Sequence, residues 1–132
     1  MKDLGYKQAT GSGWQKKGDV FIYDLFPGKR IHTTELLESP LDEGNHMLVK
    51  EFSHLYVGVL NEYDLIASKL FRGTEVDFED CLMLVKAYRD KIDIKRVERH
   101  VKKLASYDIS EKRIVENVVS FLNLLRKEKY YG

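Results

Sequence analysis

The stretch Asp64-Leu-Ile-Ala-Ser-Lys69-Leu-Phe-Arg72-Gly-Thr-Glu-Val-Asp77-Phe-Glu-Asp80 decides the fold of the second half of this chain. Its apolar residues return every three or four positions, which predicts a helix over residues 64–71. Gly73 is a suitable C-cap for this helix because glycine accepts a positive φ. Asp77 has the character of an N-cap for a second helix, which continues through Ala87 or Tyr88. The stretch therefore predicts a helical hairpin.

Four charged residues of this stretch are spaced to meet at one corner. Lys69 and Arg72 are three residues apart and project from one face of the first helix. Asp77 and Asp80 have the same spacing at the head of the second helix. Two antiparallel helices joined by residues 73–76 would bring the two pairs together. From chemistry alone, we interpret this as an ion-paired corner that fixes the hairpin.

Two more helices are expected after the hairpin, with Asp93 and Ser110 as their N-caps. Each has apolar residues on one face at helical spacing. These residues are Ile94, Val97, Val101 and Leu104 in the third helix, and Ile114, Val115, Val118, Phe121, Leu122 and Leu125 in the fourth.

The first half of the chain, residues 1–61, has strand and loop character. Residues 19–26 are rich in β-branched and aromatic side chains and predict a strand, which a turn at residues 26–29 ends. Residues 47–52 and 54–60 predict two more strands, and the last is apolar enough to be covered on both faces. Thr33 or Thr34 could cap a short helix that runs to Leu37. Residues 1–132 are thus expected to form one α+β domain, with a small mixed sheet of about three strands followed by a helical half at residues 62–132.

Composition places the chain among globular proteins. It has 132 residues, of which 43% are apolar and 33% charged, enough for one well-packed domain. No apolar run approaches the length of about 18 residues that a membrane span needs, and residues 1–6 are no secretory signal. The only cysteine, Cys81, lies in an apolar run. It excludes an internal disulfide and fits the core of a cytoplasmic protein.

Several common functional motifs are excluded. There is no phosphate loop, no dinucleotide-binding glycine fingerprint and no Gly-x-Ser-x-Gly elbow. No zinc site is expected, because the histidines share no metal-ligand spacing with one another or with Cys81. These histidines are His32, His46, His54 and His100.

Charge is balanced over the whole chain but not along it. The formal net charge is +1, which gives no general argument for nucleic-acid binding. Residues 62–80 are nevertheless acidic and residues 86–103 basic. These segments either form two solvated helix faces or hold a metal and a polyanion side by side. Arg96, Arg99 and Lys103 are the candidate contacts to nucleic-acid phosphates, and the scarcity of aromatic residues near them argues against specific base reading.

The runs Asp-Leu-Ile-Ala-x-Lys-Leu at residues 64–70 and Arg-Gly-x-x-x-Asp-x-Glu-Asp at residues 72–80 resemble a known signature. It is the C-terminal helical signature of small bacterial and archaeal nucleotidyltransferase-fold proteins. This family includes an uncharacterised group related to the toxins of AbiE-type toxin–antitoxin systems. The specific match covers residues 64–80, and a looser match covers residues 15–90.

The resemblance also shows what this chain lacks. In active members of the family, a Gly-Ser turn precedes an Asp-x-Asp or Asp-x-Glu pair, which holds two Mg²⁺ ions together with a third carboxylate. The turn Gly11-Ser12 is present here, but no such pair follows it. The chain is therefore expected to begin after the first metal-binding motif or to be a shortened, inactive relative. Asp24 is the preferred third carboxylate and metal ligand. Asp19 is the alternative, because an odd separation places the two on opposite faces of a strand.

The resemblance further implies roles for the corner residues. Lys69 would meet nucleotide phosphates or a catalytic carboxylate. Asp77 and Asp80 would orient the helix pair, and Arg72, displaced from its place in the family pattern, would help to bind the substrate. The implied activity is the binding of a nucleotide or nucleic acid, with Mg²⁺ as cofactor, in a toxin–antitoxin or defence setting.

Three hypotheses for function result. The chain is an active nucleotidyltransferase, a non-catalytic relative that binds nucleotide, nucleic acid or protein, or a helical interaction module whose corner is only structural. A sheet without the first strands of the family fold would expose an edge, which predicts pairing with a second copy.

Overall fold

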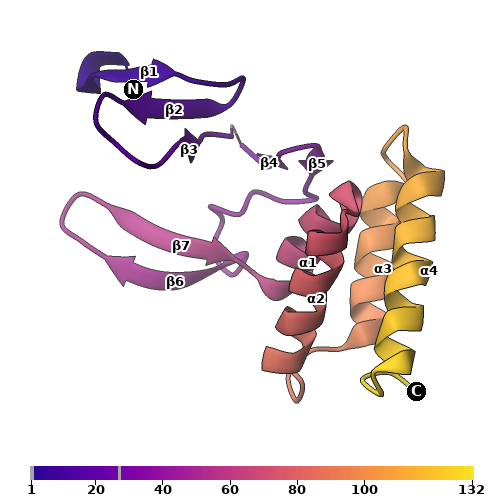
Figure 1. The fold of residues 1–132 in the computed structure, drawn as a ribbon. Helices are drawn as coiled ribbons and strands as arrows, with labels where there is room; N and C mark the ends of the chain where they lie inside the picture. Colours follow the sequence, from indigo (N-terminus) through magenta and orange to yellow (C-terminus); the bar gives the residue numbers. More distant parts are fainter. Residues whose placement is uncertain (1, 27) are drawn as a thin grey trace.

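The computed structural model describes residues 2–26 and 28–132. Strands occupy the first half and helices the second, so the α+β class is confirmed (Figure 1). The helices stand side by side, and the strands project from one side of them as separate small sheets. The predicted turn at residues 26–29 includes Pro27, which lies outside the described residues.

The sheet is divided into three antiparallel pieces instead of one mixed sheet. Each piece is a local meander or hairpin, and none pairs with another within the described residues. The first piece contains β1 (Tyr6–Gln8), β2 (Gly13–Lys16) and β3 (Tyr23–Asp24), the second β4 (Arg30–Ile31) and β5 (Thr34–Glu35), and the third β6 (His46–Glu51) and β7 (Tyr56–Leu60).

Two predictions for the first half are wrong. Of the strand expected over residues 19–26, only Tyr23–Asp24 is a strand, β3. Val20, which precedes it, is 88% exposed. Apolar content indicated a strand there, but no second sheet covers these side chains. The helix expected from Thr33 or Thr34 to Leu37 is replaced by the β4–β5 hairpin. His32 has a positive φ of 51° in its tight turn, a conformation that a helix cannot contain.

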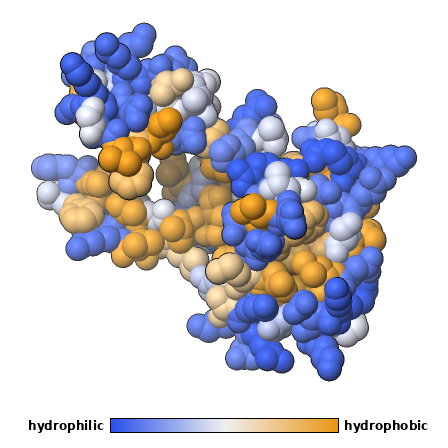
Figure 2. Space-filling view, in the orientation of Figure 1, coloured by the Kyte–Doolittle hydropathy of each residue, from blue (hydrophilic) through white to orange (hydrophobic). Residues whose placement is uncertain are grey.

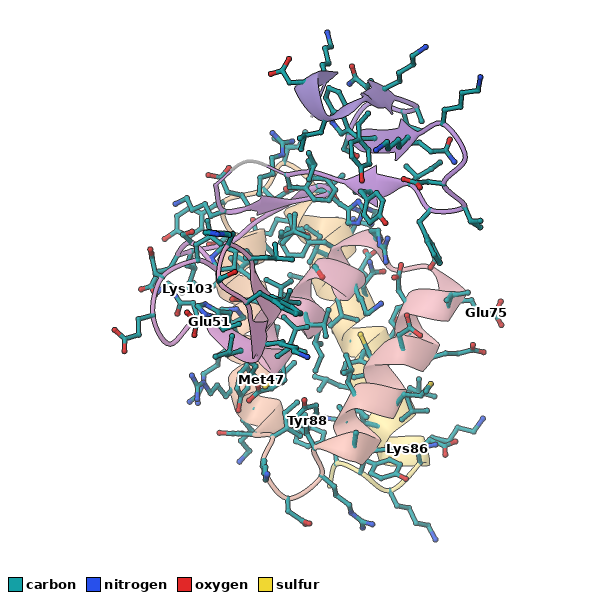
Figure 3. The ribbon with its side chains drawn as sticks, turned by 90° about the vertical axis from the view of Figure 1, so that its left-hand side faces the viewer. Met47, Glu51, Glu75, Lys86, Tyr88 and Lys103 are labelled. Atoms are coloured by element: carbon teal, nitrogen blue, oxygen red, sulfur yellow. The ribbon has the colours of Figure 1, made fainter. Side chains whose placement is uncertain are left out.

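The β6–β7 hairpin confirms two strands near their expected positions, but not their burial. Its register shifts between Leu48 and Lys50. Val59 in β7 is 44% exposed, so the prediction of a strand covered on both faces is wrong. The hairpin reaches the helices near its base, where the hydroxyl of Tyr88 lies 4.0 Å from the sulfur of Met47 (Figure 3).

Local signals locate the four helices well. They are α1 (Glu62–Arg72), α2 (Glu75–Ala87), α3 (Ile94–Ala105) and α4 (Glu111–Lys127). Gly73 ends α1 in the left-handed region, with φ of 69°, as predicted. Asp93 caps α3 through its side chain, whereas Ser110 precedes α4 without a side-chain cap bond. The N-cap of α2 is Thr74 instead of Asp77.

The hydrophobic core is helical. Helix α1 packs against α2, α3 and α4, and α3 packs against α4. Cys81 belongs to this core, where burial raises the pKa of its thiol to about 12, so it is an inert thiol at neutral pH. In the strand half Leu36 is buried, but many other hydrophobic residues lie at the surface, both along the β6–β7 hairpin and between it and the N-terminal strands (Figure 2).

Candidate functional site

The four charged residues of the α1–α2 corner meet as predicted. Lys69 Nζ lies 2.6 Å from Asp80 Oδ2, and Arg72 Nη2 lies 2.5 Å from Asp77 Oδ1. Each pair joins one residue of α1 to one of α2. The corner is therefore an ion-paired clamp across the short Gly73–Thr74 connection.

Asp77 is the most enclosed member of the corner, with only 2% of its surface exposed. Its carboxylate accepts hydrogen bonds from the backbone N–H and the hydroxyl of Thr74, at 3.2 and 2.7 Å, and Thr74 Oγ1 accepts from the N–H of Asp77. This is a capping box with aspartate at its third position. Burial alone would raise the pKa of Asp77. The hydrogen bonds from Thr74 and Arg72 and the positive charge of Arg72 outweigh burial, so the pKa lies below its ordinary 3.8.

Lys69 and Asp80 form the pair with the more exposed carboxylate. The Lys69 side chain is 18% exposed and the Asp80 side chain 40% exposed. A phosphate that approached Lys69 would therefore compete with a carboxylate that water already reaches. Asp80 is thus the more exposed carboxylate of the corner, whereas Asp77 is buried.

Asp24 does not join this corner through any contact that the structure describes. It lies in β3 of the N-terminal sheet, where its Oδ1 accepts a hydrogen bond of 2.7 Å from the hydroxyl of Ser12. Asp19 lies outside the strands. Among residues 2–26 and 28–132, no three side chains of His, Cys, Asp or Glu are grouped to hold a metal. The described residues thus do not fit the Mg²⁺ centre that the resemblance implies, and no catalytic step is assigned to it.

A second polar cluster, which the sequence did not reveal, joins α1 to α3. Asp64 is buried, and its carboxylate accepts hydrogen bonds of 2.7 Å from His100 Nε2 and 2.8 Å from Asn61 Nδ2. The Arg96 guanidinium stacks 4.3 Å from the ring centroid of Tyr63. These five residues line part of a cavity of about 410 Å³ beside the base of the β6–β7 hairpin.

The candidate nucleic-acid contacts Arg96, Arg99 and Lys103 all lie on the exposed side of α3. Figure 3 places Lys103 on one flank of the helices and Glu75, at the start of the acidic α2, on the other. Helix α1 packs between α2 and α3. The exposed acidic side of α2 and the exposed basic side of α3 are therefore separated, and the acidic and basic segments meet where Asp64 of α1 bonds to His100 of α3.

Comparisons with family models, curated proteins and solved structures found no significant match to this chain. In the part of the chain that the structure describes, no helix is both long and apolar enough to cross a membrane.

Proposed function

We propose that this chain is a nucleotidyltransferase-like domain that has lost catalysis and binds a nucleotide or nucleic acid. The observation that carries the proposal is the α1–α2 corner, where the residues of the resemblance form one cluster. Lys69 is its ligand-binding residue, because its partner Asp80 is partly open to water. Asp77 and Arg72 hold the helix pair in place. A cytoplasmic role in a toxin–antitoxin or defence setting belongs to the same proposal.

Nucleotide binding should depend on Lys69. Replacing Lys69 with alanine removes one charge-assisted contact to phosphate, and we expect the Kd for a nucleoside triphosphate to rise about tenfold or more. Isothermal titration calorimetry measures this change. Lys127→Ala is the control, because Lys127 is an exposed lysine near the end of α4, away from the corner.

The two lysine variants separate the possible outcomes. A Kd that rises for Lys69→Ala and stays within about twofold for Lys127→Ala supports the proposed function. An equal rise in both variants would instead show that binding depends on general charge, and the role of Lys69 would be abandoned.

The second candidate is an interaction module that pairs with a copy of itself through the β6–β7 hairpin. A two-stranded hairpin is marginal by itself, and within the described residues β7 pairs only with β6. Antiparallel self-pairing about Gly58 would place Val57 opposite Val59 without opposing any charges. The exposed apolar side chains of the hairpin favour this candidate.

Self-association is tested by sedimentation equilibrium. We expect a dimer that Val59→Lys disrupts, because self-pairing would bury the new charge. Val76→Lys, on an exposed valine of α2, is the control. A monomer for the unmodified chain at all concentrations excludes this candidate.

A further inference from the structure

The exposed face of α3 is strongly basic. Helix α3 has five basic residues and one acidic residue, a net charge of +4 with His100 neutral. Its buried residues Ile94, Val97, Val101, Leu104 and Ala105 face the core. At about 100° per residue, the bases fall within an arc of about 120° on the opposite side, centred on Arg99. These bases are Lys95, Arg96, Arg99, Lys102 and Lys103, and we call them the α3 basic face.

Most of the basic face is free of protein acceptors. Lys102 is paired with Glu98, and Arg96 stacks on Tyr63. Within the described residues, the structure gives no ion pair or hydrogen bond to the side chain of Lys95, Arg99 or Lys103. Three cationic side chains on one helix face can therefore bind anions without first breaking an internal contact.

The helix dipole favours Lys102 and Lys103, which lie in the last turn of α3, but it does not explain the bases of the first turn. Lys95 and Arg96 occupy the first turn, where the positive end of the helix dipole disfavours cations. That turn contains no acidic residue inside the helix. The longer α4 mixes signs, with Glu111, Lys112 and Glu116 among its exposed residues. An extended anion on α3 would relieve the repulsion that the fold otherwise tolerates.

The other uses of a basic helix fit less well. A membrane-surface helix inserts its apolar face into lipid, but the apolar face of α3 is already packed against α1 and α4. A row of separated positive charges on a rigid helix matches a polymer with regularly spaced phosphates. Backbone phosphates carry no sequence information, so binding of this kind does not depend on sequence.

We propose that the α3 basic face binds the phosphate backbone of a nucleic acid. This inference rests on the proposed function and specifies a polymer as the ligand, at a surface separate from Lys69. Arg99 makes the central contact, and Lys95 and Lys103 lie on either side of it. Arg96, held on Tyr63, presents its remaining N–H groups at the edge of the face.

The test measures binding of a fluorescein-labelled 20-nucleotide strand by anisotropy over a range of salt concentrations. The variant is Lys95→Gln/Arg99→Gln/Lys103→Gln. The control, Lys17→Gln/Lys112→Gln/Lys127→Gln, removes the same charge from exposed positions outside α3. Circular dichroism should show that both are folded, because none of these side chains has a described partner. For the α3 variant we expect at least a tenfold higher Kd at low salt and a salt slope smaller by roughly 2.

Each outcome bears on the inference. A stronger loss in the α3 variant than in the control supports it. Equal losses in both variants overturn it, as does binding to vesicles of anionic lipid without binding to the strand. If the strand does not bind but a nucleoside triphosphate binds through Lys69, the inference fails and the proposed function stands. If the strand binds through α3 and Lys69→Ala has no effect on nucleotide, the inference stands and the role of Lys69 fails.

Discussion

Replacing Asp77 with alanine is expected to lower the free energy of unfolding by about 2–3 kcal/mol. The change removes the acceptor for the backbone N–H and hydroxyl of Thr74, and so destroys the capping box of α2. It also leaves Arg72 without its partner. The ion-pair part of the loss is small, because the Arg72 side chain is 41% exposed and water can solvate it. Most of the cost comes from the cap and from the cavity left by a buried side chain.

Denaturant titration followed by circular dichroism at 222 nm measures this loss. The matched control is Glu79→Ala, which removes the same charge from the exposed side of the same helix and should change stability by less than about 0.5 kcal/mol. Equal losses in the two variants would show that the net charge of α2 matters and that the buried geometry of Asp77 does not.

The pH dependence of the same pair gives an independent check. The pKa of Asp77 is lower in the folded chain than in the unfolded chain. Its ionised form therefore stabilises the fold fully above the unfolded-state pKa of about 3.9, and this contribution is lost as pH falls through the lower folded-state value. The stability difference between the unmodified chain and Asp77→Asn should be constant from pH 5 to 7 and shrink below about pH 4. A difference that grows on acidification would contradict the assigned direction.

The helical half was predictable because its signals are local. Asp93 and Gly73 mark helix ends through bonds that reach only three or four residues, and the ion pairs of Lys69 and Arg72 follow from the antiparallel hairpin. The N-cap of α2 was misplaced for a definite reason. Thr74 and Asp77 form a capping box with aspartate where glutamate or glutamine is usual, so Asp77 was read as the cap itself.

The strand half was less predictable because strand formation depends on what covers a strand. The composition of residues 19–26 and 54–60 favours strands, but burial comes from tertiary partners that composition does not reveal. The Asp64–His100 bond was missed for a similar reason, since the two residues are 36 positions apart and only the packing of α1 on α3 joins them. The common face of Arg96 and His100, four residues apart, was the one local signal that pointed to that cluster.

The residues proposed to bind a ligand, Lys69 and the α3 basic face, lie on the helices. The buried residues of α1 and α3 belong to one hydrophobic cluster. Asp24 sits on a small sheet that shares no pairing with the other strands in the described part of the chain. The positions of α1 and α3 are therefore fixed by the helical core, whereas a function built on Asp24 would need a larger sheet to fix its position.

Replacing Gly73 with alanine should destabilise the domain by about 2–4 kcal/mol, through two separable causes. The first is backbone strain, because a side chain at φ of 69° meets its own carbonyl in the left-handed region. The second is steric: a Cβ at this position would overlap the side chain of Asn117. Asn117 donates a hydrogen bond of 2.8 Å to the carbonyl of Leu70 at the end of α1, so displacing it leaves that carbonyl unpaired.

A double-mutant cycle separates the two causes. Asn117→Ala alone loses the bond to Leu70 but makes room for a Cβ, so the double variant Gly73→Ala/Asn117→Ala should cost less than the sum of the single changes. Gly44→Ala is the control for strain, because Gly44 also has a positive φ, of 85°, with no atom near the added Cβ. It should cost about 1 kcal/mol. If the costs of Gly73→Ala and Asn117→Ala are strictly additive, the Asn117 side chain moves aside at no cost. Backbone strain alone then explains why glycine is needed at the end of α1.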